Sequence, residues 1–371
     1  MNEILKDYMR LDNKIELISE KFNIDIKKAK ELLNFVSFYF PLLLKLEKEI
    51  KLYNSKLKSK NKLIDEALKY FANLNSDGKF LRATLIALGY ENGGKDDDEF
   101  LGLSLAYEFF QTAILIHDDA IDRSDIRRGK QTINSIYSDR FSQLKDKEHI
   151  ANSLSVCVGD LGFYMANQII VDRYYNHPNL APTLKYFNDV VMQTACGEFI
   201  DVYLPNERKM EDIEPLIMDI YKLKTSMYTV VGPYCLGMIL SGKSEIKEIE
   251  KILMDIGVAY QIRDDIFGIY GKFTQKSVTS DVEEFKQTIL YSYAINTPYK
   301  NELLKYYGKK TGKKELEKVR EILEVCGAKK YAEDKMKKLF DRARKNIENS
   351  NLKNKEALLG LMVYLELSVK W

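Results

Sequence analysis

The stretch from Leu101 to Asp122 reads LGLSLAYEFFQTAILIHDDAID. Its first part would leave almost no polar face on a helix, and a helix that is apolar all round is normally a central one. Its end carries Asp118, Asp119 and Asp122, and residues four apart lie on one face of a helix. Neighbouring carboxylates repel one another unless a cation compensates them, and Mg²⁺ prefers a few carboxylates plus waters and substrate phosphates. The stretch therefore predicts a central helix that ends in a magnesium site.

A second apolar stretch, Leu253 to Tyr270, also carries paired carboxylates, in the motif Gln261-x-x-Asp264-Asp265. Two such helices in one bundle are expected to bring both acidic clusters to the mouth of one cavity. That arrangement would hold a diphosphate through several Mg²⁺ ions. A single Asp-Asp pair is more often a solvated helix end. Because both pairs follow apolar helices, we favour the metal interpretation here.

The composition indicates a helix-rich protein. The chain has 371 residues, with 57 Lys and Arg against 55 Asp and Glu, which argues against a polybasic nucleic-acid binder. Seven Pro and nineteen Gly are few for a fold with many turns. Four cysteines without a C-x-x-C pair and three scattered histidines predict neither disulfides nor a zinc site. With no secretory signal and no apolar run long enough to span a membrane, a cytoplasmic location is expected.

Helical patterns extend over most of the chain. Apolar segments at residues 150–170, 190–203 and 221–241 predict further inner helices. Residues 1–60 are rich in Lys and Glu and predict peripheral N-terminal helices. Residues 61–371 are expected to form one large helical domain around a deep hydrophobic cavity. No alternation is long enough for a sheet, so we predict an all-α fold.

Basic residues accompany the two acidic clusters. They are, in chain order, Lys79, Arg82, Arg127, Arg128, Lys224, Lys276 and Lys286. Arg matches phosphate oxygens with a bidentate fork, and Lys does so as a point charge. A single surface cation is usually only solvated. Their order along the chain, before and after the two aspartate clusters, is what indicates a diphosphate site.

In this order the motifs resemble those of the trans-isoprenyl diphosphate synthases, the all-helical polyprenyl synthetase family. The two aspartate-rich motifs are Asp118-Asp119-x-x-Asp122, followed by Arg127-Arg128-Gly129, and Gln261-x-x-Asp264-Asp265. The other matches are Gly78-Lys79-x-x-Arg82, Gln111, Gly197-Glu198-x-x-Asp201, Lys224-Thr225 and the series Lys276, Asp281, Lys286 and Thr288. The resemblance covers about residues 65–300, and the first sixty residues match no family motif.

The resemblance implies a Mg²⁺-dependent prenyltransferase that joins isopentenyl diphosphate head-to-tail to an allylic diphosphate. The allylic substrate would be dimethylallyl, geranyl or farnesyl diphosphate. About three Mg²⁺ would be held by Asp118, Asp119, Asp122, Asp264 and Asp265. The diphosphate would also be bound by Arg127, Lys224, Lys276 and Lys286. The family further suggests a homodimer.

The resemblance also implies how the second substrate is held. Lys79, Arg82, Gln111 and Arg128 would orient isopentenyl diphosphate so that its alkene faces the carbocation. The carbonyls of Lys224 and Thr225, with Gln261, would stabilise that cation. No side-chain base is required, since the departing diphosphate takes the proton in this family.

Product length is expected to depend on the helix that leads away from Asp118. Ala113 and Ile114 lie about one turn from it, and Phe109 and Phe110 lie one turn further. Because Ala113 is small, we expect a product of about C20, geranylgeranyl diphosphate, and expect a Phe at position 113 to shorten it. The alternative is that these four residues only pack the core.

Three departures from the family pattern stand out. Gly268 replaces the third aspartate of the second motif, as in part of the family, and Gln275 and Phe285 replace the glycines that usually precede Lys276 and Lys286. The sequence also leaves alternative functions open. A farnesyl or longer polyprenyl synthase would differ only in product, and a silent subunit of a heteromeric synthase would normally lose aspartates. A terpene cyclase or a head-to-head synthase would share the fold and the first aspartates. A cyclase would carry an Asn/Ser/Glu metal triad on the second helix, where this chain has Asp264-Asp265, and the Gly78-Lys79-x-x-Arg82 motif has no use without a second diphosphate.

Overall fold

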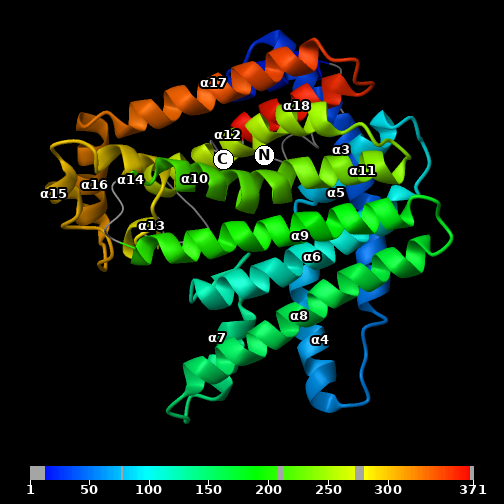
Figure 1. Ribbon diagram of the computed structural model, residues 1–371, viewed down its shortest axis with the longest axis horizontal. Coiled ribbons are helices and arrows are strands. Elements are labelled where there is room, and N and C mark those ends of the chain that lie inside the picture. The colour runs from blue at the N-terminus through cyan, green and yellow to red at the C-terminus, as the bar shows by residue number, and fades with distance from the viewer. Residues whose placement is uncertain (1–12, 77, 208–211, 272–279, 368–371) are drawn as a thin grey trace. The chain divides into compact units, whose positions relative to one another are not determined.

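The computed structural model describes residues 13–76, 78–207, 212–271 and 280–367 (Figure 1). Within these ranges the chain is helical apart from turns and one two-stranded hairpin. The hairpin pairs β1 (Ile126–Arg127) with β2 (Lys130–Gln131) in antiparallel fashion. The prediction of an all-α fold is therefore confirmed.

Contacts divide the chain into two compact units. Unit 1 comprises residues 1–40, 186–235 and 243–371, and unit 2 comprises residues 41–185 and 236–242. Three helices pass from one unit into the other, namely α3 (Ile26–Asn54), α9 (Leu180–Tyr203) and α11 (Gly232–Leu240). The boundary expected after residue 60 falls inside unit 2 and stays a prediction.

Unit 2 is built around α6 (Phe100–Ile121), which packs against α5 (Leu81–Asn92) and α8 (Lys147–Tyr174) (Figure 1). Most of α6 is buried, as expected for a central helix. A Cβ atom at Gly162 of α8 would lie only 2.8 Å from the Cβ of Ala113, so the two helices approach closely. The unit is completed by α4 (Lys62–Asn75), the hairpin and α7 (Ile133–Arg140).

Unit 1 is built around α12 (Lys247–Tyr270), which packs against the π-helix η2 (Tyr221–Val231) and α17 (Ala328–Glu348). Its other elements are α2 (Lys14–Phe22), η1 (Leu204–Asn206), α10 (Glu214–Ile220), α13 (Ser280–Glu283), α14 (Ile289–Ala294), α15 (Lys300–Leu303), α16 (Lys313–Val325) and α18 (Lys355–Leu367). The helical segments predicted between residues 190 and 270 correspond to α9, to η2 with α11, and to α12, whereas α10 was not predicted.

The beginning of α3 contributes to the core of unit 1. Leu32 and Phe35 are fully buried, and the Glu31 carboxylate accepts from Arg344 of α17 at 2.8 Å. A side chain at Gly360 would clash with the backbone carbonyl of Glu31, so α18 lies directly on α3. One face of this segment is buried, while Lys27, Lys30 and Asn34 on its other face are exposed. The peripheral placement of residues 1–60 stays a prediction.

Two of the described helices, α6 and α8, are long and apolar enough to cross a membrane by length and composition alone. In α6, 72% of the most apolar window is buried inside the protein, and core helices commonly meet the same criterion. In α8 the buried share is 39%. The apolar character of α6 is therefore explained by its place in the core of unit 2, whereas α8 keeps an exposed apolar face.

Candidate active site

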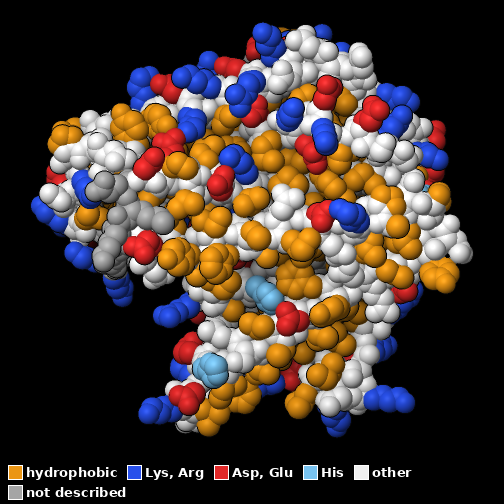
Figure 2. All heavy atoms as spheres, in the orientation of Figure 1, with side chains coloured by type: hydrophobic (Ala, Val, Ile, Leu, Met, Phe, Trp, Pro, Cys, Tyr) orange, Lys and Arg blue, Asp and Glu red, His pale blue; other side chains and the backbone are white. Residues whose placement is uncertain are grey.

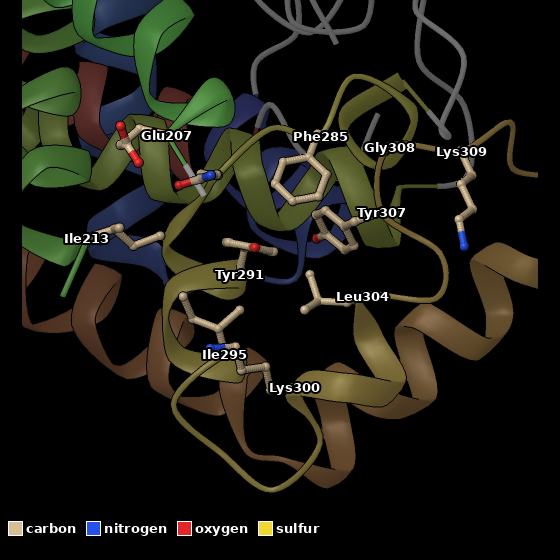
Figure 3. A pocket seen from close by; sticks show the side chains of 11 residues that line it. Glu207, Ile213, Phe285, Tyr291, Ile295, Lys300, Leu304, Tyr307, Gly308 and Lys309 are labelled. Atoms are coloured by element: carbon tan, nitrogen blue, oxygen red, sulfur yellow. The ribbon is translucent and has the colours of Figure 1, made fainter. Parts of the chain in front are cut away.

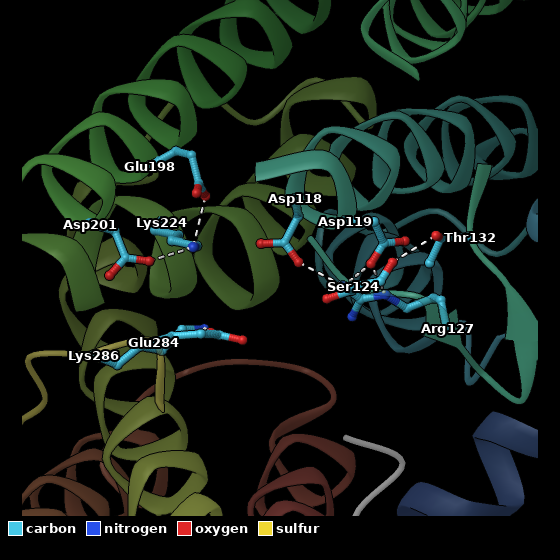
Figure 4. Close-up of polar contacts among 10 residues, drawn as sticks. All are labelled: Asp118, Asp119, Ser124, Arg127, Thr132, Glu198, Asp201, Lys224, Glu284 and Lys286. Carbon is cyan, nitrogen blue, oxygen red and sulfur yellow. Dashed lines mark hydrogen bonds and ion pairs between the residues drawn. The ribbon is translucent and has the colours of Figure 1, made fainter. Parts of the chain in front are cut away.

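The first aspartate cluster lies at the carboxyl end of α6, in unit 2. Asp118 and Asp119 are in the last turn of the helix, and Asp122 follows its last residue. Arg127 of β1 reaches back to both carboxylates, with Nη2 2.7 Å from Oδ2 of Asp118 and Nε 2.8 Å from Oδ1 of Asp119 (Figure 4). Asp119 is buried, so the guanidinium compensates a desolvated charge. The structure thus brings together two predicted metal ligands and one predicted diphosphate ligand.

The hairpin that carries Arg127 turns at Arg128 and Gly129, whose φ angles are 53° and 75°. Positive φ at both central residues defines a type I′ turn, which suits a two-residue hairpin. Nη1 of Arg128 lies 3.4 Å from the carbonyl oxygen of Leu74, at the end of α4. A Cβ atom at Gly78 would lie 3.6 Å from the same nitrogen. The turn therefore places Arg128 beside the segment that carries Lys79.

A buried carboxylate, Glu108, lies near two of the predicted isopentenyl diphosphate ligands. Glu108 is on α6, one turn before Gln111, and Oε1 of its carboxyl has no hydrogen-bond partner among the described residues. Burial raises the pKa of Glu108 to about 7, while the charges of Arg82 and Arg128 oppose this rise. Both arginines therefore act on the same carboxyl. Sequence reasoning missed Glu108, although a charged residue inside an apolar helix was a usable signal.

Three of the four residues predicted to set product length are fully buried in unit 2. The ring of Phe109 packs edge-on against Tyr53, with centroids 5.1 Å apart, and Phe110 packs against Phe163 at 5.8 Å. Ala113 faces Gly162 of α8. Ile114 is the exception, because it is only partly buried.

Lys224 lies in η2, in unit 1, between two carboxylates of α9. Its Nζ is 2.8 Å from Oε2 of Glu198 and 2.6 Å from Oδ2 of Asp201 (Figure 4). A side chain at Gly197 would clash with the backbone nitrogen of Lys224, so only glycine allows α9 to lie this close. The Gly197-Glu198-x-x-Asp201 motif thus binds Lys224 through two carboxylates and a close backbone contact. A π-helix at this point agrees with the frequent occurrence of π-bulges at functional sites.

The second aspartate motif is tied into a hydrogen-bond network within unit 1. Oγ1 of Thr225 donates to Oε1 of Gln261 at 2.6 Å, and Nε2 of Gln261 donates to Oδ1 of Asp265 at 2.8 Å. The hydroxyl of Tyr221 donates to Oδ2 of Asp265. Burial raises the pKa of Asp265 to about 8. Asp264 is more open, with 39% of its side chain exposed, and pairs with Arg263.

The structure explains one departure from the family pattern, at Gly268, and shows the backbone conformation at a second, Phe285. A side chain at Gly268 would clash with Oδ2 of Asp281, so the carboxylate of Asp281 lies where the third aspartate would project. Phe285 adopts a φ of 58°, a conformation in which glycine is normally found. Lys286 follows it, with Nζ 3.4 Å from Oε2 of Glu284. Lys276 and Gln275 lie outside the described residues.

Carboxylate oxygens at both clusters fit a hard cation such as Mg²⁺. Among the described residues, no three His, Cys, Asp or Glu side chains are gathered as a complete metal cage. Mg²⁺ is usually bound through one or two carboxylates together with waters and substrate phosphates, so it does not need such a cage. The donors present are compatible with metal that arrives with a diphosphate.

An all-helical fold with aspartates at helix ends and cations paired to them defines the class of isoprenoid synthases. The sequence matches the polyprenyl synthetase family over residues 61–326, and the chain belongs to this family. Its enzyme class is therefore that of the isoprenyl diphosphate synthases, which are prenyltransferases.

Several known proteins are similar to this chain. A geranylfarnesyl diphosphate synthase of Aeropyrum pernix is 27% identical over 80% of this chain and 92% of its own length. An octaprenyl diphosphate synthase of Escherichia coli is 27% identical over 78% and 85%. A geranylgeranyl pyrophosphate synthase of Corynebacterium glutamicum, solved with isoprenyl diphosphate and magnesium, has a TM-score of 0.75 at 23% identity and covers 91% of this chain and 97% of its own. The last similarity confirms the fold.

Proposed function

We propose that this chain condenses isopentenyl diphosphate with an allylic diphosphate, head-to-tail, in a reaction that depends on Mg²⁺. Family membership and the order of the motifs support this proposal. The Corynebacterium glutamicum synthase was solved with isoprenyl diphosphate and magnesium, which are the ligands expected for this chain.

The observation that carries the proposal is that two predicted diphosphate ligands are each paired with carboxylates. Arg127 is paired with two carboxylates in unit 2, and Lys224 is paired with two in unit 1. A metal–diphosphate complex can exchange with such pairs, because the carboxylates take the metal and the cations take the phosphate oxygens. Each cation is therefore already placed beside carboxylates before the substrate binds.

Cleavage of the allylic carbon–oxygen bond leaves negative charge on the diphosphate and a carbocation on the prenyl chain. Mg²⁺, when bound through Asp118, Asp122 and Asp264, would supply positive charge to the leaving group. Arg127, Lys224 and Lys286 would add hydrogen bonds to its oxygens. The carbonyls of Lys224 and Thr225, with Gln261, would face the carbocation.

Isopentenyl diphosphate would be held in unit 2 by Lys79, Arg82, Gln111 and Arg128. Its alkene attacks the carbocation, a new carbon–carbon bond forms, and the departing diphosphate takes the proton. Fixed orientation of two bound reactants removes much of the entropic barrier. No side-chain base is needed, because the departing diphosphate accepts the proton.

For the product, we propose about C20, geranylgeranyl diphosphate, with Phe109, Phe110, Ala113 and Ile114 as the floor of the chain-binding site. The relatives include geranylfarnesyl, octaprenyl and geranylgeranyl synthases, so their names leave chain length open. The small Ala113 supports a chain longer than C15. Its contact with Gly162 supports core packing instead, and the two alternatives are tested in the Discussion.

A homodimer is proposed from the surface of α8. This helix exposes Val156, Leu161 and Tyr164, with exposed fractions of 45%, 38% and 75%, and Figure 2 shows apolar side chains along it. An apolar face of this kind is typical of an interaction surface. Sedimentation equilibrium at several concentrations tests the proposal, and a monomer at every concentration would contradict it.

The activity is tested by incubating the protein alone with Mg²⁺, isopentenyl diphosphate and each allylic primer. Dimethylallyl, geranyl and farnesyl diphosphate serve as primers, and mass spectrometry identifies the products. We expect elongation that stops at about C20. No turnover with any primer would contradict the proposal and would favour a silent subunit of a heteromeric synthase.

A further inference from the structure

A tyrosine outside the predicted motifs joins two parts of the site in unit 1. Tyr221 is the first residue of η2 and is 3% exposed. Its hydroxyl donates to Asp265 and accepts a hydrogen bond of 2.8 Å from the backbone nitrogen of Ile289. Ile289 begins α14, three residues after Lys286. One buried hydroxyl therefore links the second aspartate motif to the segment that carries Lys286.

The Lys286 segment is held in an unusual backbone conformation. Phe285 has a φ of 58°, which is rare for a bulky residue and indicates strain that its surroundings maintain. Its ring packs edge-on against Tyr291, with centroids 5.5 Å apart, and against Tyr307 at 5.9 Å. The backbone nitrogen of Lys286 donates to the carbonyl of Asp281 at 2.8 Å. The position of Lys286 thus depends on anchors that lie on either side of it in the chain.

The same segment borders a pocket of about 310 Å³ within unit 1 (Figure 3). Phe285, Gln287 and Tyr291 line this pocket together with Tyr307. On that side the segment borders the pocket, while the rings of Phe285, Tyr291 and Tyr307 stay in contact with one another. The hydrogen bond between Tyr221 and Ile289 ties the start of α14 to η2.

We propose that Tyr221 is a positioning residue that couples the Lys286 segment to the second aspartate motif. The inference rests on the proposed function, because that function assigns Asp265 and Lys286 to the diphosphate. When Asp265 shifts on binding of metal and diphosphate, its hydrogen bond moves the Tyr221 hydroxyl and hence the start of α14. Lys286 is thereby drawn toward the diphosphate.

The test replaces Tyr221 with Phe, which keeps the ring and removes both hydrogen bonds. In Y221F the half-saturating Mg²⁺ concentration and the KM for the allylic substrate should rise by about tenfold, while the KM for isopentenyl diphosphate stays within about twofold. Tyr186→Phe is the matched control, because the Tyr186 hydroxyl donates to Glu250 at 2.8 Å, also within unit 1. An unchanged Y221F, or equal changes for both substrates, would overturn the proposal.

Binding is measured independently of turnover by calorimetric titration with Mg²⁺ and inorganic pyrophosphate. Y221F should bind this pair about tenfold more weakly than the wild type and Y186F do. Equal affinity in the three proteins would overturn the proposal. A wild type that binds pyrophosphate but turns over no primer would sink the proposed function alone, so the two failures are distinguishable.

If the Y221F protein does not fold, a measurement on the wild type still tests the proposal. Hydrogen exchange of the Ile289 amide is followed with and without saturating Mg²⁺ and pyrophosphate. If the Tyr221 hydroxyl couples the two elements, ligand binding should slow exchange at Ile289 and in the first turn of α14. Exchange that stays the same would contradict the coupling.

Discussion

At the scale of single residues, the site is organised by charge pairs that are mostly removed from water. The side chains of Arg127 and Asp118 are 17% and 16% exposed. Breaking a buried pair by removing one partner typically costs about 3–5 kcal/mol, because the other charge is left uncompensated. The aspartates therefore need either Arg127 or a metal. This requirement accounts for the contacts of Arg127 with both carboxylates.

Glu108 gives a prediction on pH. Its pKa is about 7 in the folded protein against an ordinary 4.5, so between these pH values the folded state binds more protons than the unfolded state. The free energy of unfolding should therefore fall as the pH rises through this window, by up to roughly 3 kcal/mol. Glu108→Gln cannot lose a proton and should lack this fall.

Chemical denaturation of both proteins from pH 4 to 8 measures the difference. The exposed Glu356, changed to Gln, controls for the loss of one negative charge. Stability curves for wild type and E108Q that run parallel across the window would show that Glu108 does not hold its proton.

Single residues were predictable where they belong to a motif. The aspartates, Arg127, Lys224 and Gln261 were all found as residue types at fixed spacing, but the pairs that they form with one another and with other motif residues were not predicted. Glu108 and Tyr221 belong to no pattern of charges, and their roles depend on burial that only the folded chain creates. An isolated Tyr on a helix carries no sequence signal, whereas Glu108, a charged residue inside an apolar helix, carried one that sequence reasoning missed.

At the scale of elements, the approach of α9 to η2 gives a second prediction. Gly197→Ala would place a Cβ atom in clashing distance of the Lys224 backbone. Overpacking of this kind should destabilise the protein by about 1–3 kcal/mol. It should also lower kcat, because Lys224 moves with its helix.

Thermal unfolding and steady-state kinetics test this second prediction. Cys196→Ala is the control, since Cys196 is the exposed neighbour on the same helix. A G197A protein with normal stability and kcat would mean that the two helices tolerate separation there.

The α6 helix gives a third prediction, on product length. Ile114 is partly buried, unlike Ala113, so Ile114→Phe should be tolerated better and should shorten the main product from about C20. Ala113→Phe should shorten the product too, but it must also displace Gly162 and should lower the unfolding temperature. Mass spectrometry and thermal unfolding separate the two effects. If both variants still make the wild-type product, these residues only pack the core.

Helices were predictable from their apolar patterns because burial imposes the pattern. The inner helices were placed within several residues of their observed bounds, except that α9 begins at Leu180, well before the predicted start at residue 190. The π-helical hydrogen bonding of η2 was not predictable. It depends on close packing against a neighbouring helix, α9, at Gly197. The contact between α3 and α18 was not predictable either, because spacing along the chain does not say which helix covers an apolar stripe.

At the scale of the whole molecule, the all-α class followed from composition, and the family followed from the order of seven short motifs. The positions of the motifs along the chain do not fix their distances in space. The Asp118 cluster belongs to unit 2 and the Asp264 cluster to unit 1. Their convergence on one diphosphate is the central claim, and it rests on the chemistry of the two clusters.

A crystal structure with Mg²⁺, isopentenyl diphosphate and an unreactive allylic thiodiphosphate tests this claim most directly. The account predicts Asp118 and Asp264 oxygens about 2.1 Å from Mg²⁺ ions that share one diphosphate. Arg127 and Lys224 should then have exchanged carboxylate partners for phosphate oxygens. A structure in which Asp118 and Asp264 point to opposite sides of the molecule, or in which the diphosphate binds away from both, would contradict the account.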